Sequence, residues 1–171
     1  MRSLGRAEHE TLTTVTGDWD SEVTFYYDPG AEPMVKRGTY HAKLDLEGYF
    51  LHREFRVNLD DAGDFKSLAF HGYGLTGFDP FQRKYLGVWA DSGSPALYWT
   101  EAAFDASGIV YTETSHGPDP VGKPLNLRMV TTTHGPDRMS FKIFRPDGGS
   151  GDVLITEMQH YRTQSCPPIS I

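Results

Sequence analysis

The sequence predicts an all-β protein in which about ten antiparallel strands close into an up-and-down barrel, with a short helix at the N-terminus. Segments of alternating apolar and polar residues recur roughly every 8–12 residues. Clusters rich in Gly, Pro and Asp join these segments at hairpin length. A meander of this many strands avoids exposed edges most simply by closing on itself. The alternative, a β-sandwich, would need a long crossover connection, and the sequence offers none.

The composition indicates one globular domain over residues 1–171, with its core within about residues 8–163. Of the 171 residues, 38% are hydrophobic, which is enough for a buried core. The formal net charge of −7 argues against nucleic-acid or anionic-membrane partners. A single cysteine, Cys166, allows no intrachain disulfide and fits a reducing compartment. Since no apolar run approaches the ~18 residues of a membrane span, we expect a soluble, cytoplasmic protein.

The N-terminal segment, residues 4–15, lacks strand character around Glu8-His9-Glu10 and predicts a short helix that packs over one end of the barrel. Gly17-Asp18-Trp19 opens the first strand, residues 19–27, which ends in a turn at Asp28-Pro29-Gly30. The other nine predicted strands cover residues 35–45, 49–57, 67–76, 84–91, 96–103, 109–116, 125–133, 139–144 and 153–162. Within the predicted strand over residues 67–76, Gly72-Tyr73-Gly74 favours a bend or bulge.

A mid-chain turn leads into the strand that we expect to carry the site. Gly77 and the Asp79-Pro80 step are typical of a turn, and the strand over residues 84–91 follows. Successive side chains of a strand point to opposite faces, so Trp89 and Asp91 share one face. If that face lines the barrel, both side chains point into it.

Several strands carry polar or charged residues on both faces, which is unusual for a solid apolar core. Arg53, for example, shares a face with Leu51 and Phe55, and Glu54 lies on the other. This pattern is typical of a barrel that encloses a largely hydrophobic cavity with some polar lining.

Five short motifs, taken in order, resemble a bacterial lipocalin-like domain of unknown function within the calycin superfamily, which contains the lipocalins and fatty-acid-binding proteins. They are Gly17-Asp18-Trp19, Leu46 to Leu51, Gly77 to Pro80, Tyr85 to Asp91, and Tyr161-Arg162. The resemblance covers about residues 8–163 and implies a calycin-like barrel, closed at one end by a stack of Arg162 on Trp19. Phe78 and Ala102 stand where the family usually has Tyr and Gly, which suggests a specialised pocket. The family implies a fold and almost no chemistry.

Aromatic and polar strand residues are the candidate ligand-binding set. An indole offers an apolar wall and a carboxylate offers a hydrogen-bond acceptor, so Trp89 and Asp91 lead the set. The whole set is Trp89, Asp91, Trp99, Tyr73, Phe55, Arg53, Glu101 and Arg128, with Phe70 as a further aromatic wall. The alternative for Asp91 is a salt bridge to Arg128 or Arg53 that holds two strands in register.

Three functions follow from these residues. The first is binding of a small, largely apolar or aromatic ligand in the cavity. The second is an enzyme in the same cavity, an isomerase, cyclase or hydrolase that uses a carboxylate or histidine as acid or base; Asp91, Glu54 and His71 are the candidates. Glu54, Glu101 and Glu113 are strand carboxylates that more often lie on a solvated face. The sequence leaves open whether any reaction is catalysed.

The seven histidines include no close pair on one element, so the sequence predicts no metal site and no cofactor. Haem binding through one histidine is the third function, and it is implied only by the resemblance to nitrobindin-like calycin barrels. The expected partner is a small molecule, and the protein is a monomer or a homodimer.

Overall fold

The computed structural model describes residues 6–26, 30–59, 69–147, 149 and 151–163. A helix, α1 (Arg6–Thr11), and a 3-10 turn, η1 (Leu12–Val15), precede ten strands. The strands are β1 (Gly17–Phe25), β2 (Met34–Asp45), β3 (Phe50–Asn58), β4 (Ala69–Asp79), β5 (Lys84–Asp91), β6 (Ser94–Phe104), β7 (Val110–Pro118), β8 (Pro124–Thr133), β9 (Arg138–Pro146) and β10 (Asp152–Arg162). All ten predicted strands and the N-terminal helix are confirmed.

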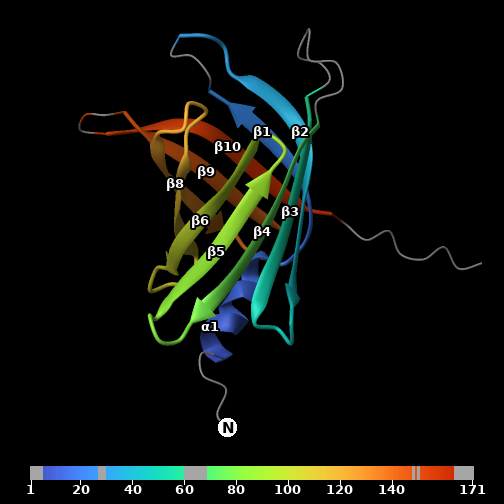
Figure 1. Ribbon diagram of the computed structural model, residues 1–171. Helices are drawn as coiled ribbons and strands as arrows, with labels where there is room; N and C mark the ends of the chain where they lie inside the picture. The colour runs from blue at the N-terminus through green and yellow to red at the C-terminus, as the bar shows by residue number, and fades with distance from the viewer. Residues whose placement is uncertain (1–5, 27–29, 60–68, 148, 150, 164–171) are drawn as a thin grey trace, which may run out of the picture.

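The strands form one closed antiparallel barrel in which each strand pairs with its neighbours in sequence, and β1 pairs with β10 to close it (Figure 1). The closing ladder runs from Trp19 opposite Arg162 to Phe25 opposite Thr156. The up-and-down barrel is therefore confirmed. Among the described residues, no helix is long and apolar enough to cross a membrane.

The strand ends differ from the prediction in the mid-chain turn. Gly77 and Asp79 belong to β4, and the turn comprises only the next few residues. The carboxylate of Asp79 accepts hydrogen bonds from the backbone N–H groups of Phe81 and Gln82, and Arg83 has a φ of 56°. Because the Asp79 side chain satisfies these two backbone N–H groups of the turn, β4 can extend as far as Asp79 before the chain reverses direction. Cys166 and the predicted 28–30 turn, except Gly30, lie outside the described residues.

One end of the barrel is closed by α1 and η1 (Figure 1). Leu12 and Val15 are buried against Trp19 and the ends of several strands, and the Tyr85 hydroxyl donates to the Glu8 carbonyl at 2.7 Å. The guanidinium of Arg162 lies over the Trp19 ring at 4.1 Å, and its Nε donates to the Pro136 carbonyl at 2.7 Å. The predicted Trp19–Arg162 stack is therefore confirmed.

The glycines at 72 and 74 do not form a bulge, because β4 pairs with β3 and β5 there without any register shift. They make room for the indole of Trp89 instead. A Cβ at Gly72 would lie 2.2 Å from Trp89 Cζ2, and one at Gly74 would lie 2.9 Å from Cε3. The nearest shift in register is in the β5–β6 pairing, between Trp89 and Asp91.

Candidate ligand-binding site

A buried ion pair crosses the interior of the barrel. Arg53 on β3 donates to both carboxylate oxygens of Glu113 on β7, at 3.0 and 2.9 Å. The two side chains are 11% and 2% exposed. Because β4, β5 and β6 separate β3 from β7 in the wall, this pair spans the enclosed space instead of linking adjacent strands. The bidentate geometry is the strongest that the two side chains can form.

Two threonine hydroxyls hold the ion pair in place. Arg53 Nη2 lies 3.0 Å from Thr76 Oγ1, and Thr100 hydrogen-bonds to Glu113. Gly87 of β5 lies between the two threonines, and a Cβ there would be 2.7 Å from each hydroxyl and from the Leu75 carbonyl. Glycine at this position therefore lets both hydroxyls reach the pair.

The ion pair stays charged in spite of its burial. Burial raises the pKa of Glu113, but the charge of Arg53 and hydrogen bonds from Arg53 and Thr100 outweigh it, so the net shift is downward. For Arg53, burial opposes the positive charge, and Glu113 raises the pKa above its usual range. Each charge thus depends on the other.

Two tyrosines, Tyr40 and Tyr111, lie near enough to the ion pair to interact electrostatically with Arg53. Burial raises the pKa of Tyr40 to about 12, and burial also raises the pKa of Tyr111 well above its usual range. Both phenols are therefore neutral at pH 7. Within the described part of the chain, Tyr111 Oη and Arg53 Nε are buried without a hydrogen-bond partner.

The ion-pair layer separates two apolar clusters of different burial. In the cluster at the α1 end, nine of thirteen members are buried. In the other, only Val23, Phe55, Val57 and Met158 of ten members are buried. Its six partly exposed members are Phe25, Tyr40, Leu59, Phe70, Trp89 and Phe141. We call the second cluster the open half and the Arg53–Glu113 layer its floor. Solvent reaches apolar and aromatic side chains in the open half.

Asp91 positions Trp89 at the wall of the open half. Its carboxylate accepts a hydrogen bond from Trp89 Nε1 at 2.9 Å and another from the Gly93 amide at 2.9 Å. The alternative of a salt bridge is wrong, because Arg53 pairs with Glu113 and Arg128 pairs with Asp152 at 2.7 Å.

The structure brings together only part of the predicted ligand-binding set. Trp89, Asp91, Phe55 and Arg53 lie together, and Phe70 packs beside Phe55 at 6.2 Å between ring centroids. The other four residues alternate with inward-facing ones and lie on the outer wall: Tyr73, Trp99, Glu101 and Arg128. Trp99 is 63% exposed, and Glu101 pairs with Lys84 at 2.8 Å. The sequence placed these four side chains in the cavity, but in the structure each lies on the face of its strand that points out of the barrel.

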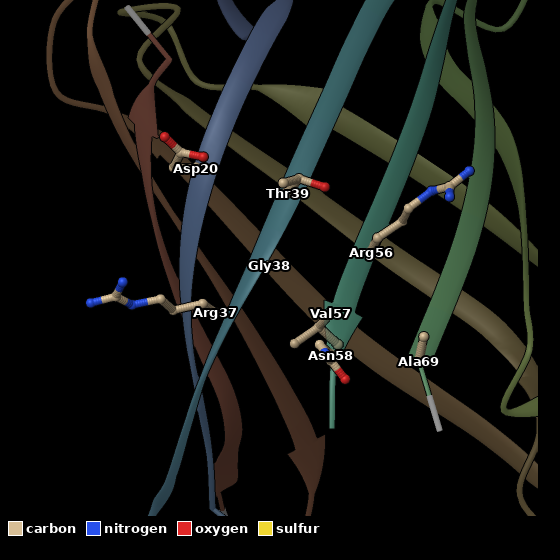
Figure 2. A pocket seen from close by; sticks show the side chains of 8 residues that line it. All are labelled: Asp20, Arg37, Gly38, Thr39, Arg56, Val57, Asn58 and Ala69. Atoms are coloured by element: carbon tan, nitrogen blue, oxygen red, sulfur yellow. The ribbon is translucent and has the colours of Figure 1, made fainter. Parts of the chain in front are cut away.

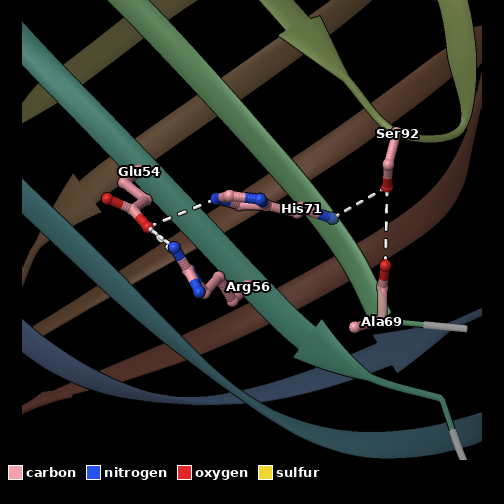
Figure 3. A network of polar contacts seen from close by, with 5 residues as sticks. All are labelled: Glu54, Arg56, Ala69, His71 and Ser92. Atoms are coloured by element: carbon pink, nitrogen blue, oxygen red, sulfur yellow. Dashed lines mark hydrogen bonds and ion pairs between the residues drawn. The ribbon is translucent and has the colours of Figure 1, made fainter. Parts of the chain in front are cut away.

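Two of the three catalytic candidates also lie on the outer wall, in the network of Figure 3. Glu54 Oε1 lies 2.6 Å from Arg56 Nε and 3.2 Å from His71 Nε2. The hydrogen bond from Arg56 lowers the pKa of Glu54. The His71 amide donates to Ser92 Oγ at 3.0 Å. This network fastens β3 and β4 to the β5–β6 turn and contains no group that faces the open half.

A depression of about 530 Å³ lies across β1 to β4 (Figure 2). It is lined by Asp20, Arg37, Gly38, Thr39, Arg56, Val57, Asn58 and Ala69. Asp20, Thr39 and Arg56 alternate with inward-facing residues, so the depression opens on the outer wall. It does not include the ion pair or Trp89.

His160 is an interior residue that the sequence did not single out for the site. It is 3% exposed, its Nδ1 lies 2.7 Å from Ser21 Oγ, and its ring lies 5.2 Å from that of Tyr40. Burial lowers its pKa to about 4, so the imidazole is neutral at pH 7. No group of three or more His, Cys, Asp or Glu side chains within the described ranges could hold a metal ion.

We expect His160 to make the protein less stable in mild acid. The unfolded imidazole takes up a proton near pH 6.5 and the folded one only near pH 4, so stability is lost as the pH falls between these values. The full loss is about 3 kcal/mol. Urea unfolding of His160→Asn, whose amide still reaches Ser21, should show a smaller difference between pH 7 and pH 4.5 than the parent. Equal differences would show that His160 does not titrate in this way.

The fold and site define a ten-stranded antiparallel barrel that is sealed at one end and has a charged floor across its interior. The chain belongs to the family described as "Protein of unknown function (DUF1579)", whose model matches residues 5–162. Among solved structures, it is similar to Rv2717c from M. tuberculosis, with a TM-score of 0.66 and 15% identity over 91% of this chain and 96% of that one.

A redesigned beta barrel gives a TM-score of 0.46 at 11% identity, covering 90% of this chain and 96% of that one. No curated protein matches the chain in sequence. At these identities the structural likeness to Rv2717c concerns the fold alone.

Proposed function

We propose that this protein binds a small, largely apolar or aromatic molecule in the open half of the barrel. The observation that carries the proposal is the partial exposure of Trp89, Phe70 and Phe141 around a buried polar floor. Ligand pockets are typically concave, mostly apolar and equipped with a few fixed polar groups. The order of lipocalin-like motifs supports the same function, since lipocalins bind small molecules in their barrels.

Replacement of Trp89 tests this proposal against a matched control on the outer wall. Trp89→Leu should weaken binding of 1-aminoanthracene, a neutral fluorescent aromatic probe, by about 10-fold because the indole wall is lost. Trp99→Leu removes an indole from the outer face of the next strand and should leave the affinity unchanged. Fluorescence titration of both folded variants gives the answer. Weaker binding by the Trp99 variant alone would place the probe outside the barrel and overturn the proposal.

Catalysis in the same interior is the second candidate, favoured by the hydrogen bond between Ser21 and His160. A histidine with a pKa of about 4 is a weak base at pH 7, so binding ranks first. Haem binding through one histidine stays a prediction, and a Soret band in the absorbance spectrum would support it. We further propose a bacterial, cytoplasmic protein whose partner is the small molecule itself, acting as a monomer or homodimer. Native mass spectrometry of the purified protein would report both the bound molecule and the oligomeric state.

A further inference from the structure

An exposed apolar face covers the outer wall of β4, β5 and β6, which lie side by side in Figure 1. Val88 is at its centre, with Leu75 opposite it on β4 and Trp99 opposite it on β6. Tyr73 and Leu97 lie next to them on the same side of these two strands. We call these five residues the outer apolar face. Trp99, Leu97 and Tyr73 are 63%, 51% and 45% exposed, and contiguous exposure of this kind marks interaction surfaces.

The two aromatic side chains of the outer apolar face are suited to docking. The ring of Tyr73 packs on those of His71 and His52, at centroid distances of 4.4 and 6.1 Å, so the two imidazoles hold it in place. Among the described residues, no ring stacks on the indole of Trp99 and no side chain hydrogen-bonds to it. Trp and Tyr are the usual anchors of protein interfaces, and a ring that is already held loses little conformational entropy on docking.

The charged side chains at the borders of the face are paired within the chain. On the β6 side, Glu101 pairs with Lys84 at 2.8 Å. On the β3 side, Glu54 pairs with Arg56 at 2.6 Å, and His71 contacts the same carboxylate oxygen. The face itself consists of aliphatic and aromatic side chains. An identical face can therefore approach it in spite of the net charge of −7, since charges elsewhere on the surface are screened beyond about 8 Å at physiological salt.

The face is self-complementary about a two-fold axis that runs along β5. Leu75, Val88 and Trp99 lie in one row across the three strands, so this axis sets Trp99 of one copy over Leu75 of the other. Because β4 and β6 are both antiparallel to β5, they run in the same direction, and the axis also sets Leu97 over Tyr73. Val88 then meets Val88 at the axis. Each aromatic side chain thus packs on an aliphatic one.

We propose that the outer apolar face is the interface of a two-fold symmetric dimer, in which a second copy of this chain covers Trp99 and Tyr73. These two side chains expose about 250 Å² together, roughly a third of the ~800 Å² that each partner buries in a standard interface. Their aliphatic neighbours and the paired borders supply the rest. An interface at the small end of the range forms a weak dimer, with a Kd of about 10–100 µM. The dimer does not depend on what the barrel binds.

Sedimentation velocity of the full chain between about 1 and 300 µM tests the interface. The parent should change from monomer to dimer over this range. Trp99→Glu places a charge where docking would bury it, so it should weaken association by at least about 100-fold and stay monomeric. Phe81→Glu is the matched control, because Phe81 is 88% exposed in the turn after β4, outside the face, and this variant should dimerise like the parent.

Cross-linking locates the axis independently of Trp99. Sheets that pack face to face lie about 10 Å apart, so in Val88→Cys a short bis-maleimide should join the two copies at ~100 µM protein. The background is Cys166→Ser, which removes the natural cysteine. Val130→Cys, on the outer wall of β8, is the control for Val88→Cys and should give little cross-linked dimer.

Three results would overturn the inference: a parent that is monomeric at every concentration, a Trp99→Glu variant that dimerises like the parent, or Val130→Cys that cross-links as readily as Val88→Cys. Circular dichroism checks that each variant is folded. At ~1 µM protein the chain is monomeric, so unfolding and 1-aminoanthracene titrations at that concentration report on the monomer. Loss of the dimer therefore leaves ligand binding in the open half standing, and failure of the dye to bind leaves the dimer standing.

Discussion

Glu113→Leu should lower the free energy of unfolding by about 3–5 kcal/mol, because it leaves the Arg53 guanidinium charged and unpaired in the interior. Both carboxylate oxygens of Glu113 accept hydrogen bonds from the terminal nitrogens of Arg53, and among the described residues the only other acceptor for Arg53 is the Thr76 hydroxyl. Water cannot replace a carboxylate at a site where the two side chains are 11% and 2% exposed. Urea unfolding at pH 7 measures the loss. The m value, which is the dependence of the unfolding free energy on urea concentration, should equal that of the parent.

The double variant Arg53→Met with Glu113→Leu is the matched control. Removal of both charges leaves no stranded ion, and replacement of a buried pair by apolar residues is often neutral or stabilising. The double variant should therefore be more stable than either single variant. The coupling free energy from the double-mutant cycle should exceed ~0.5 kcal/mol, the deviation from additivity that independent sites show. Additive effects of the two substitutions would show that the residues do not form the pair described above.

Trp19→Ala should lower the free energy of unfolding by about 3–5 kcal/mol, the usual cost of removing a large buried aromatic side chain. Trp19 belongs to the α1-end cluster, where it packs with Leu12 and Val15, and Arg162 stacks on its ring at 4.1 Å. The alanine variant therefore loses two sets of contacts together: the packing of Trp19 against the N-terminal segment and its stacking with Arg162 where β1 pairs with β10. Thermal or urea unfolding followed by circular dichroism measures the effect.

Trp99→Ala is the control for this prediction, because Trp99 lies on the outer wall and is 63% exposed. Its substitution should change the free energy of unfolding by no more than ~0.5 kcal/mol. The folded fraction of Trp19→Ala should bind 1-aminoanthracene like the parent, since Trp19 lies beyond the floor from the open half. Equal stability of Trp19→Ala and the parent would contradict the role of Trp19 in closing the barrel.

The fold was predictable because its signals are local. Alternation and turn clusters mark each strand independently, and the strand over residues 84–91 matches β5 at both ends. The Trp19–Arg162 stack followed from the resemblance, and β1–β10 closure places the two residues opposite each other. The extension of β4 to Asp79 was missed because Gly77 and Pro80 are strong turn signals, whereas the capping of Phe81 and Gln82 by Asp79 depends on three-dimensional geometry.

The site was only partly predictable, because alternation groups residues by face without saying which face is inside. Arg53 and Phe55 were placed together with Trp89, but Trp99 and Tyr73 were assigned to the same cavity although they lie on the outer wall. The partner of Arg53 is 60 positions away in the sequence, and no local pattern connects them. A usable signal was present in Gly87, a glycine inside a strand, which marks a place where other side chains approach closely.

We propose that a small aromatic molecule enters the open half of the barrel and rests above the Arg53–Glu113 floor. A crystal of the protein soaked with 2-bromonaphthalene tests it most directly, because anomalous scattering locates the bromine without reference to the rest of the ligand. We expect a bromine peak among Trp89, Phe55 and Phe141 inside the barrel. A peak on the outer wall beside Trp99, or in the depression beside Gly38, with none inside, would contradict it.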